Sequence, residues 1–263
     1  MRKPKTVELF LSLGLTMTLV GCAGATNTDE TADDTTAPSE ETVVAEGGEG
    51  GEGGEGGEGG EGGEGGEGAE YSAGEQANAD FQDQLSGADL LGALQEGGHV
   101  IYFRHAQTER DYADQADPNM DLNDCETQRK LNDVGIQQSR DIGAAFTEKA
   151  IPVGDVIASD YCRAWQTAEL AFGRYENNSS LNFLPFEEYT DAQVEEMKAN
   201  VMPLLTEVPE SGQNTVIVGH DDIFEAATGI YPAPQGLAYV LTPDGEGGFE
   251  LVANMLPEEW ADL

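Results

Sequence analysis

Two histidines and two arginines stand at positions from which they could act on one substrate. Each follows one of three short apolar runs of the sequence: Arg104, His105, Arg163 and His220. An arginine presents a planar fork of donors that matches phosphate oxygens, and it stays charged at physiological pH. A neutral imidazole can attack phosphorus, while a second histidine can bind the phosphate. These residue types therefore indicate chemistry on a phosphoryl group.

The elements that must position these residues follow from the pattern of apolar residues. Short apolar runs alternate with longer amphipathic stretches, which is typical of an α/β domain. We predict strands at residues 100–103, 155–158, 181–186 and 215–218, and helices at residues 88–95, 132–149, 164–172 and 191–205. Residues 237–241 and 249–253 are predicted to form a terminal hairpin.

The expected fold is a three-layer α/β sandwich with a mostly parallel central sheet flanked by helices. Gly135 and Gly143 are unfavourable within the second predicted helix. In open α/β sheets, ligands bind beyond the carboxyl ends of the strands. The two histidines and two arginines should therefore converge on one rim of the sheet.

The segments around these residues resemble the motifs of one protein family. They are Arg104-His105-Ala106-Gln107-Thr108, Arg163-Ala-Trp-Gln-Thr-Ala-Glu and Val218-Gly219-His220, in that order along the chain. Together they resemble the histidine phosphatase superfamily, branch 1, which has the phosphoglycerate-mutase-like fold. The resemblance spans about residues 98–260. Ala106 stands where the family usually has glycine, a departure that concerns the geometry of the site rather than its chemistry.

The resemblance implies a role for each residue of the cluster. His105 would be the nucleophile and would carry a phosphohistidine until water hydrolyses it. Arg104, Arg163 and His220 would complete the phosphate pocket. No metal and no other cofactor is implied, because the arginines supply the positive charge. His99 precedes the first predicted strand without such neighbours, and we expect it to be structural.

The acid that protonates the leaving group has three candidates. Asp221 is preferred because it directly follows His220, as in family members with a His-Asp pair. Glu187 is the second candidate, since mutase-like members place a glutamate after the corresponding strand. Glu169 lies about 240° around its predicted helix from the arginine of that helix and should face solvent. Asp221 could instead be a helix N-cap, with Asp222 as the alternative cap.

The first 22 residues have the form of a lipoprotein signal peptide. A basic start and an apolar run lead to Leu19-Val20-Gly21-Cys22, which resembles a bacterial lipobox. The resemblance implies cleavage before Cys22 and lipid attachment to its sulfur, so that the apolar run is removed and spans no membrane. An ordinary signal peptide with a coincidental cysteine is the alternative. Ala23, a non-acidic residue, favours the outer membrane.

Composition separates the rest of the chain into two parts. Residues 23–70 are predicted to form a disordered acidic tether rich in glycine and glutamate, because they cannot bury a core. Residues 71–263 should form one domain. The chain has a formal net charge of −39, which repels nucleic-acid phosphates and anionic lipid headgroups. We therefore expect no nucleic-acid partner, and membrane contact only through the lipid anchor.

Two further cysteines, Cys125 and Cys162, remain once Cys22 is assigned to lipid. In an exported chain such a pair can persist as a disulfide, which would tie the loop after His105 to the turn that carries Arg163. Two separate free thiols are the alternative.

These features favour a phosphomonoester hydrolase of the bacterial cell envelope, acting on a phosphorylated small molecule or protein. The stretch between Arg163 and His220 is short for the family and leaves little room for a large lid. An uncovered site admits water, which favours hydrolysis. A phosphoglycerate-mutase-type phosphoryl transfer is one alternative, which export disfavours. A non-catalytic envelope lipoprotein that binds a phosphorylated ligand is another.

Overall fold

The computed structural model of the protein describes residues 71–263, apart from 111 and 187. The predicted signal peptide with Cys22, the predicted tether and Glu187 lie outside the described residues.

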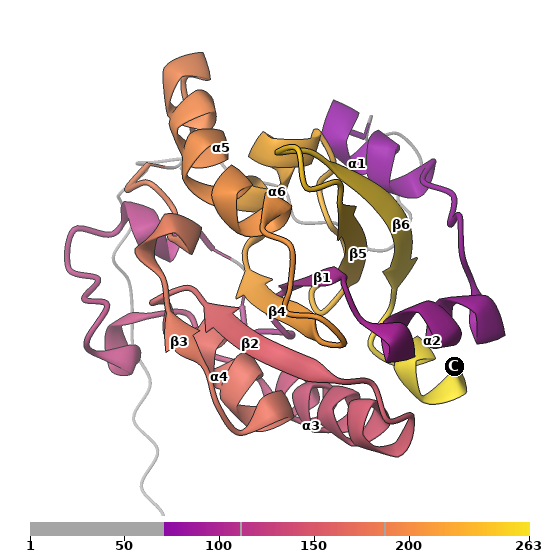
Figure 1. The fold of residues 1–263 in the computed structure, drawn as a ribbon. Helices are drawn as coiled ribbons and strands as arrows, with labels where there is room; N and C mark the ends of the chain where they lie inside the picture. Colours follow the sequence, from indigo (N-terminus) through magenta and orange to yellow (C-terminus); the bar gives the residue numbers. More distant parts are fainter. Residues whose placement is uncertain (1–70, 111, 187) are drawn as a thin grey trace, which may run out of the picture. The chain divides into compact units, whose positions relative to one another are not determined.

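The described strands form one six-stranded sheet in the order β3-β2-β4-β1-β5-β6 (Figure 1). They are β1 (Val100–Arg104), β2 (Val153–Ala158), β3 (Glu176–Asn177), β4 (Asn214–Gly219), β5 (Ala238–Pro243) and β6 (Phe249–Met255). The first four strands in this order run parallel to their neighbours, and β5 and β6 extend the sheet as an antiparallel hairpin. The predicted mostly parallel sheet and the terminal hairpin are confirmed.

Helices connect the strands and cover the sheet. They are α1 (Ala73–Ala79), α2 (Gly87–Glu96), α3 (Asp133–Glu148), α4 (Cys162–Phe172), α5 (Asp191–Thr206) and α6 (Asp221–Thr228). Short 3-10 helices are η1 (Asp114–Ala116), η2 (Cys125–Thr127), η3 (Ser179–Leu181) and η4 (Glu259–Asp262). No helix in the described part of the chain is long and apolar enough to cross a membrane.

Strand β1 divides its side chains between two hydrophobic cores, because successive residues of a strand point to opposite faces. Ile101 and Phe103 pack with residues of α2, α3, α4 and η4. Val100 and Tyr102 pack with residues of α5 and α6 on the other face. Figure 1 shows α3 and α4 below the sheet and α5 and α6 above it. The three-layer architecture is confirmed.

Helix α3 keeps its two glycines because other parts of the chain approach it closely. A Cβ atom on Gly135 would collide with the backbone of Gln107. A Cβ atom on Gly143 would collide with the backbone of Ala171 in α4. The glycines thus allow close packing between α3, α4 and the loop after β1, and this packing outweighs their low helix propensity.

The predicted strand at residues 181–186 is wrong. The parallel partner of β2 at this edge is the two-residue strand β3, and the chain then turns through η3. Leu181 is buried in one core, and Phe183 packs against Tyr161. Asn182, between them, accepts hydrogen bonds from the Ser159 hydroxyl and the Asp160 amide. The alternating apolar pattern therefore reflects burial of a loop and not a strand.

Candidate active site

The carboxyl ends of β1, β2 and β4 bring the predicted residues together. Arg104, the last residue of β1, is paired with Gly219, the last residue of β4. His105 and His220 follow directly, and their ring centroids lie 5.6 Å apart. Arg163 lies in the first turn of α4, shortly after β2 ends. All four predicted residues are buried, and both histidines are 0% exposed.

The imidazole of His105 is held in one tautomer. Its Nδ1 lies 2.8 Å from the carbonyl oxygen of Ala106, which can only accept, so Nδ1 carries the proton. The lone pair is then on Nε2. Burial, reinforced by the positive charge of Arg163, holds the pKa of His105 well below its usual value of 6.5. His105 is therefore a neutral base with a free electron pair, which is the form a nucleophile needs.

His220 is fixed by a hydrogen bond and by aromatic packing. The hydroxyl of Ser159 donates to Asn182 Oδ1 at 2.8 Å, so its oxygen can accept from His220 Nε2 at 2.9 Å. The imidazole ring packs on Phe183, with 4.1 Å between centroids. Burial, followed by the charge of Arg163, holds the pKa of His220 well below its usual range. Both histidines are neutral before an anion enters.

Arg163 is oriented by an aspartate that the sequence analysis did not single out. Asp114 in η1 is 0% exposed and accepts from Arg163 Nη1 at 2.8 Å. The guanidinium also lies over the rings of Tyr161 and Phe183, at 4.7 and 5.5 Å from the centroids. Removing one member of such a buried pair is costly, so Asp114 fixes the direction of the Arg163 side chain.

Asp221 orients the side chain of Arg104 through a similar buried ion pair. Its Oδ2 lies 2.6 Å from Arg104 Nη2 and accepts from the Tyr231 hydroxyl at 2.8 Å. Burial alone would raise the pKa of Asp221, but Arg104 and Tyr231 lower it, and it is ionised. The N-cap of α6 is His220, and Asp221 is the first helical residue, so the N-cap interpretation of Asp221 is wrong.

The neighbouring carboxyl group of Asp222 differs in charge state. Burial and the negative charge of Asp221 raise its pKa to about 7. Asp222 is also not the helix cap. Glu169 is exposed on α4, as expected. Glu187 is outside the described residues. Among the described carboxyl groups of the site, Asp222 is therefore the one that can hold a proton near neutral pH.

Sequence comparison finds one family that is similar to the segment carrying most of this cluster. The model of the histidine phosphatase superfamily (branch 1) matches residues 100–199. This part of the chain is similar to that superfamily. The match contains Arg104, His105 and Arg163, and the similarity supports phosphatase activity on a phosphorylated substrate. Comparison with curated proteins gave no significant match.

Solved structures of phosphatases are similar to this chain at low sequence identity. The protein histidine phosphatase SixA, complexed with tungstate, has 18% sequence identity and a TM-score of 0.45, covering 61% of this chain and 98% of its own. A mycobacterial glucosyl-3-phosphoglycerate phosphatase, complexed with VO3, has 15% identity and a TM-score of 0.41, covering 59% of this chain and 97% of its own.

The candidate active site holds a third arginine, Arg129, which the sequence analysis missed. Arg129 is 6% exposed, and its Nη2 lies 3.1 Å from His105 Nε2. Its backbone N–H donates to Asp114 Oδ2 at 2.9 Å. The same oxygen accepts a hydrogen bond from Arg163 Nη1. The signal that could have found Arg129 is its place shortly after Cys125, whose proposed partner adjoins Arg163.

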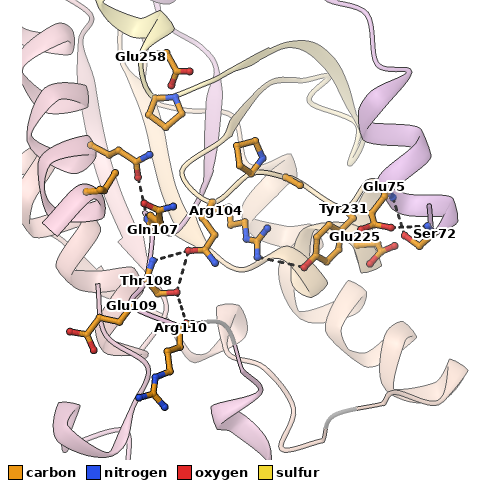
Figure 2. Close-up of a pocket in the computed structure, with 16 residues that line it drawn as sticks. Ser72, Glu75, Arg104, Gln107, Thr108, Glu109, Arg110, Glu225, Tyr231 and Glu258 are labelled. Carbon is orange, nitrogen blue, oxygen red and sulfur yellow. Dashed lines mark hydrogen bonds between the residues drawn. The ribbon is translucent and has the colours of Figure 1, made fainter. Parts of the chain in front are cut away.

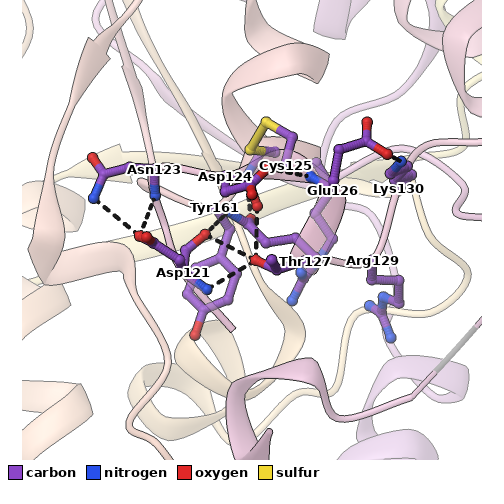
Figure 3. Close-up of a disulfide and its surroundings, with 12 residues drawn as sticks. Asp121, Asn123, Asp124, Cys125, Glu126, Thr127, Arg129, Lys130 and Tyr161 are labelled. Carbon is purple, nitrogen blue, oxygen red and sulfur yellow. Dashed lines mark hydrogen bonds and ion pairs between the residues drawn. A yellow bond between two sulfur atoms is a disulfide. The ribbon is translucent and has the colours of Figure 1, made fainter. Parts of the chain in front are cut away.

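A disulfide joins Cys125 and Cys162, with 5.7 Å between the Cα atoms (Figure 3). It links η2 to the first residue of α4. Beside it, the Cys162 amide donates to Gln128 Oε1 at 2.8 Å. The loop that carries Arg129 is thereby attached to the helix that carries Arg163.

Two cavities adjoin the candidate active site without including its histidines. The larger, of about 790 Å³, is lined by Arg104, Tyr231 and Gln107 among others (Figure 2). The smaller, of about 290 Å³, is lined by Arg129. Each cavity therefore reaches one arginine of the site, Arg104 or Arg129, but neither is lined by His105 or His220. In the part of the chain that the structure describes, no three metal-binding side chains gather.

Proposed function

We propose that the protein is a phosphomonoester hydrolase that works through a phosphohistidine on His105 without a metal. The observation that carries the proposal is the state of this residue: a buried neutral imidazole, with Nδ1 bound to a carbonyl and Nε2 turned to an arginine. A neutral Nε2 among guanidinium groups can attack a phosphorus atom whose charge those groups balance.

The reaction proceeds in two displacements. His105 Nε2 attacks phosphorus, the bond from phosphorus to the leaving oxygen breaks, and that oxygen takes a proton from a nearby acid. Water then attacks the phosphohistidine, the phosphorus–nitrogen bond breaks, and the acid recovers its proton. Arg104 and Arg163 stabilise the phosphoryl oxygens in both steps, since charge-assisted hydrogen bonds are the stronger kind. His220 joins them once the phosphate dianion has raised its pKa and the imidazole has taken up a second proton.

Asp221 and Asp222 together form the proposed proton donor. Two adjacent carboxyl groups titrate as a pair, and the pair holds a proton up to a pH of about 7, mainly on Asp222. A phosphate dianion on Arg104 weakens the hold of that arginine on Asp221 and favours its protonation. Asp221→Asn and Asp222→Asn distinguish the two residues: loss of the donor slows poor leaving groups much more than activated ones. If neither variant shows this selectivity, Glu187 takes the role.

The proposal also covers the organisation of the chain. Residues 1–22 act as a lipoprotein signal peptide, Cys22 carries lipid, residues 23–70 form the tether and residues 71–263 form the catalytic domain at the cell envelope, with the outer membrane preferred. The disulfide supports export, because such bonds persist in oxidising compartments. Metabolic labelling with a fatty acid tests the anchor: Cys22→Ser should abolish labelling, and a labelled variant would contradict lipidation at Cys22.

The decisive experiment is hydrolysis of p-nitrophenyl phosphate by residues 23–263. The wild-type protein should turn over and form an acid-labile phosphoenzyme, whereas His105→Ala should do neither. His99→Ala is the matched control, because His99 is buried at the opposite end of β1 and bonds Thr242 instead. It should stay active. A wild-type protein that is inert on a broad panel of phosphate esters and forms no phosphoenzyme would show the proposal to be wrong.

A further inference from the structure

Arg129, which belongs to none of the three sequence motifs, makes a direct contact with the nucleophile. Its Nη2 lies 3.1 Å from His105 Nε2. Because a guanidinium only donates and Nδ1 holds the imidazole proton, Arg129 donates to the lone pair on Nε2. That lone pair is the one that must attack phosphorus. The contact therefore cannot persist during the reaction.

The position of Arg129 is fixed by groups that also fix Arg163. One carboxylate oxygen of Asp114 accepts from the Arg129 backbone and from the Arg163 side chain. Arg129 Nη1 donates to the Tyr112 carbonyl at 3.2 Å. The disulfide between Cys125 and Cys162 holds the same two segments together. Arg129 is thus built into the phosphate site rather than carried on a free surface loop.

The donor of Arg129 occupies the place that the substrate needs. A reacting atom must approach to about 3–3.5 Å of the nucleophile, and Nη2 already lies at that distance. An entering phosphoryl group displaces Nη2 from Nε2 and brings its own oxygens beside the guanidinium. A phosphate dianion also offsets the burial and the Arg163 charge that lower the pKa of Arg129 to about 9.

We propose that Arg129 is a further phosphate-binding residue of this enzyme. In the structure it donates to His105 Nε2, and on substrate entry it transfers that hydrogen bond to a phosphate oxygen and so frees the nucleophile. This inference rests on the proposed phosphatase function. It adds a third arginine to the two that the motifs supply.

The test compares Arg129→Ala and Arg129→Lys with the wild-type protein, using p-nitrophenyl phosphate as substrate and inorganic phosphate as inhibitor. Arg129→Ala should raise KM and the inhibition constant of phosphate about 10- to 100-fold, the usual range for a lost hydrogen bond between charged groups. Arg129→Lys should raise both several-fold, because the charge remains and the fork is lost. Arg140→Ala is the matched control, since Arg140 is exposed on α3, and should stay within twofold.

Chemical rescue separates phosphate binding from a structural role. Added guanidinium ion should restore part of the activity of Arg129→Ala and none of Arg140→Ala. Unchanged KM and phosphate inhibition in Arg129→Ala, without a response to guanidinium, would overturn the inference. If Arg129→Ala does not fold, Arg129→Lys provides the test. A KM and a phosphate inhibition constant of Arg129→Lys within twofold of the wild-type values would then overturn the inference.

Failure of the proposed function gives a different pattern. A wild-type protein that neither turns over nor forms a phosphoenzyme contradicts the hydrolase. Calorimetric titration with inorganic phosphate still tests Arg129 in that case: weaker binding by Arg129→Ala than by the wild type supports the phosphate-binding role, and equal binding refutes it.

Discussion

The carbonyl oxygen of Ala106 determines which nitrogen of His105 reacts. Because it accepts from Nδ1, the other nitrogen keeps its electron pair. The Ala106 amide in turn donates to the Thr167 hydroxyl at 3.1 Å, which holds this peptide in place. The methyl group of Ala106 is fully buried in the structure. Alanine in place of the family's usual glycine is thus accommodated, and the backbone contact that the chemistry needs is present.

The raised pKa of Asp222 predicts a stabilising substitution. A carboxyl group whose folded pKa is raised from 3.8 to about 7 contributes stability that is lost as the pH rises through 7. Asp222→Asn cannot ionise, so it should raise the free energy of unfolding at pH 8 by roughly 1–3 kcal/mol, with partial solvent access reducing the full effect. At pH 5 the difference should be less than half as large, because most of the interval between 3.8 and 7 lies above that pH. Urea unfolding at the two pH values measures it.

Asp244→Asn is the control of opposite sign. Hydrogen bonds from the backbone of Gly248 and Glu246 lower the pKa of Asp244 in the exposed hairpin loop. Its removal should therefore reduce stability at pH 8. A destabilised Asp222→Asn at pH 8 would contradict the assigned charge state of that carboxyl group.

At the scale of elements, the contact between α3 and α4 sets the expected effect of a helix glycine. Gly143→Ala should lower the free energy of unfolding, although alanine favours a helix by about 1 kcal/mol, because the new Cβ would collide with the Ala171 backbone. Gly92→Ala in α2 is the matched control: nothing lies near its Cβ, so the protein should gain up to about 1 kcal/mol. Thermal denaturation compares the two. Equal stabilisation would mean that the helices are not in tight contact.

Which elements the sequence could predict depends on how locally each is encoded. The strands ending in Arg104 and Gly219 are buried on both faces, so continuous apolar runs reveal them. The strand ending in Ala158 is buried mainly at its last residues, Val156 to Ala158, where its apolar run lies. The segment from Leu181 to Phe183 has an alternating apolar pattern, which is also typical of a strand, because a loop buries its two apolar side chains. Local sequence does not distinguish these two causes of an apolar run.

The site residues also differ in how far the sequence alone could predict them. Arg104, His105, Arg163 and His220 follow strands, so their convergence is a property of the sheet. Arg129 and Asp114 lie in the long connection between β1 and α3, and only tertiary contacts bring them to His105 and Arg163. The charge states of Asp221 and Asp222 depend on burial and on Arg104, which no spacing in the sequence expresses.

For the whole molecule, the net charge of −39 opposes the approach of an anionic substrate. Salt screens this repulsion over the Debye length, about 10 Å at 0.1 M, whereas the buried arginines are screened less. We expect kcat/KM for p-nitrophenyl phosphate to rise as NaCl increases from about 20 to about 200 mM. Values of kcat should change little, because bound substrate no longer feels the distant charges. A fall in kcat/KM would show that the arginine cluster dominates the approach.

The disulfide between Cys125 and Cys162 makes the geometry of the phosphate site depend on cysteine oxidation as well as on folding. Reduction, or the double variant Cys125→Ser/Cys162→Ser, should lower the free energy of unfolding by about 2–4 kcal/mol and raise KM, because Arg129 and Arg163 lose their shared tie. Reductant added to the double variant should have no further effect. Identical kinetics of the oxidised and reduced wild type would show that the bond does not shape the site. If the chain is exported as proposed, a copy still in a reducing compartment would have an incomplete phosphate site, and oxidation after export would complete it.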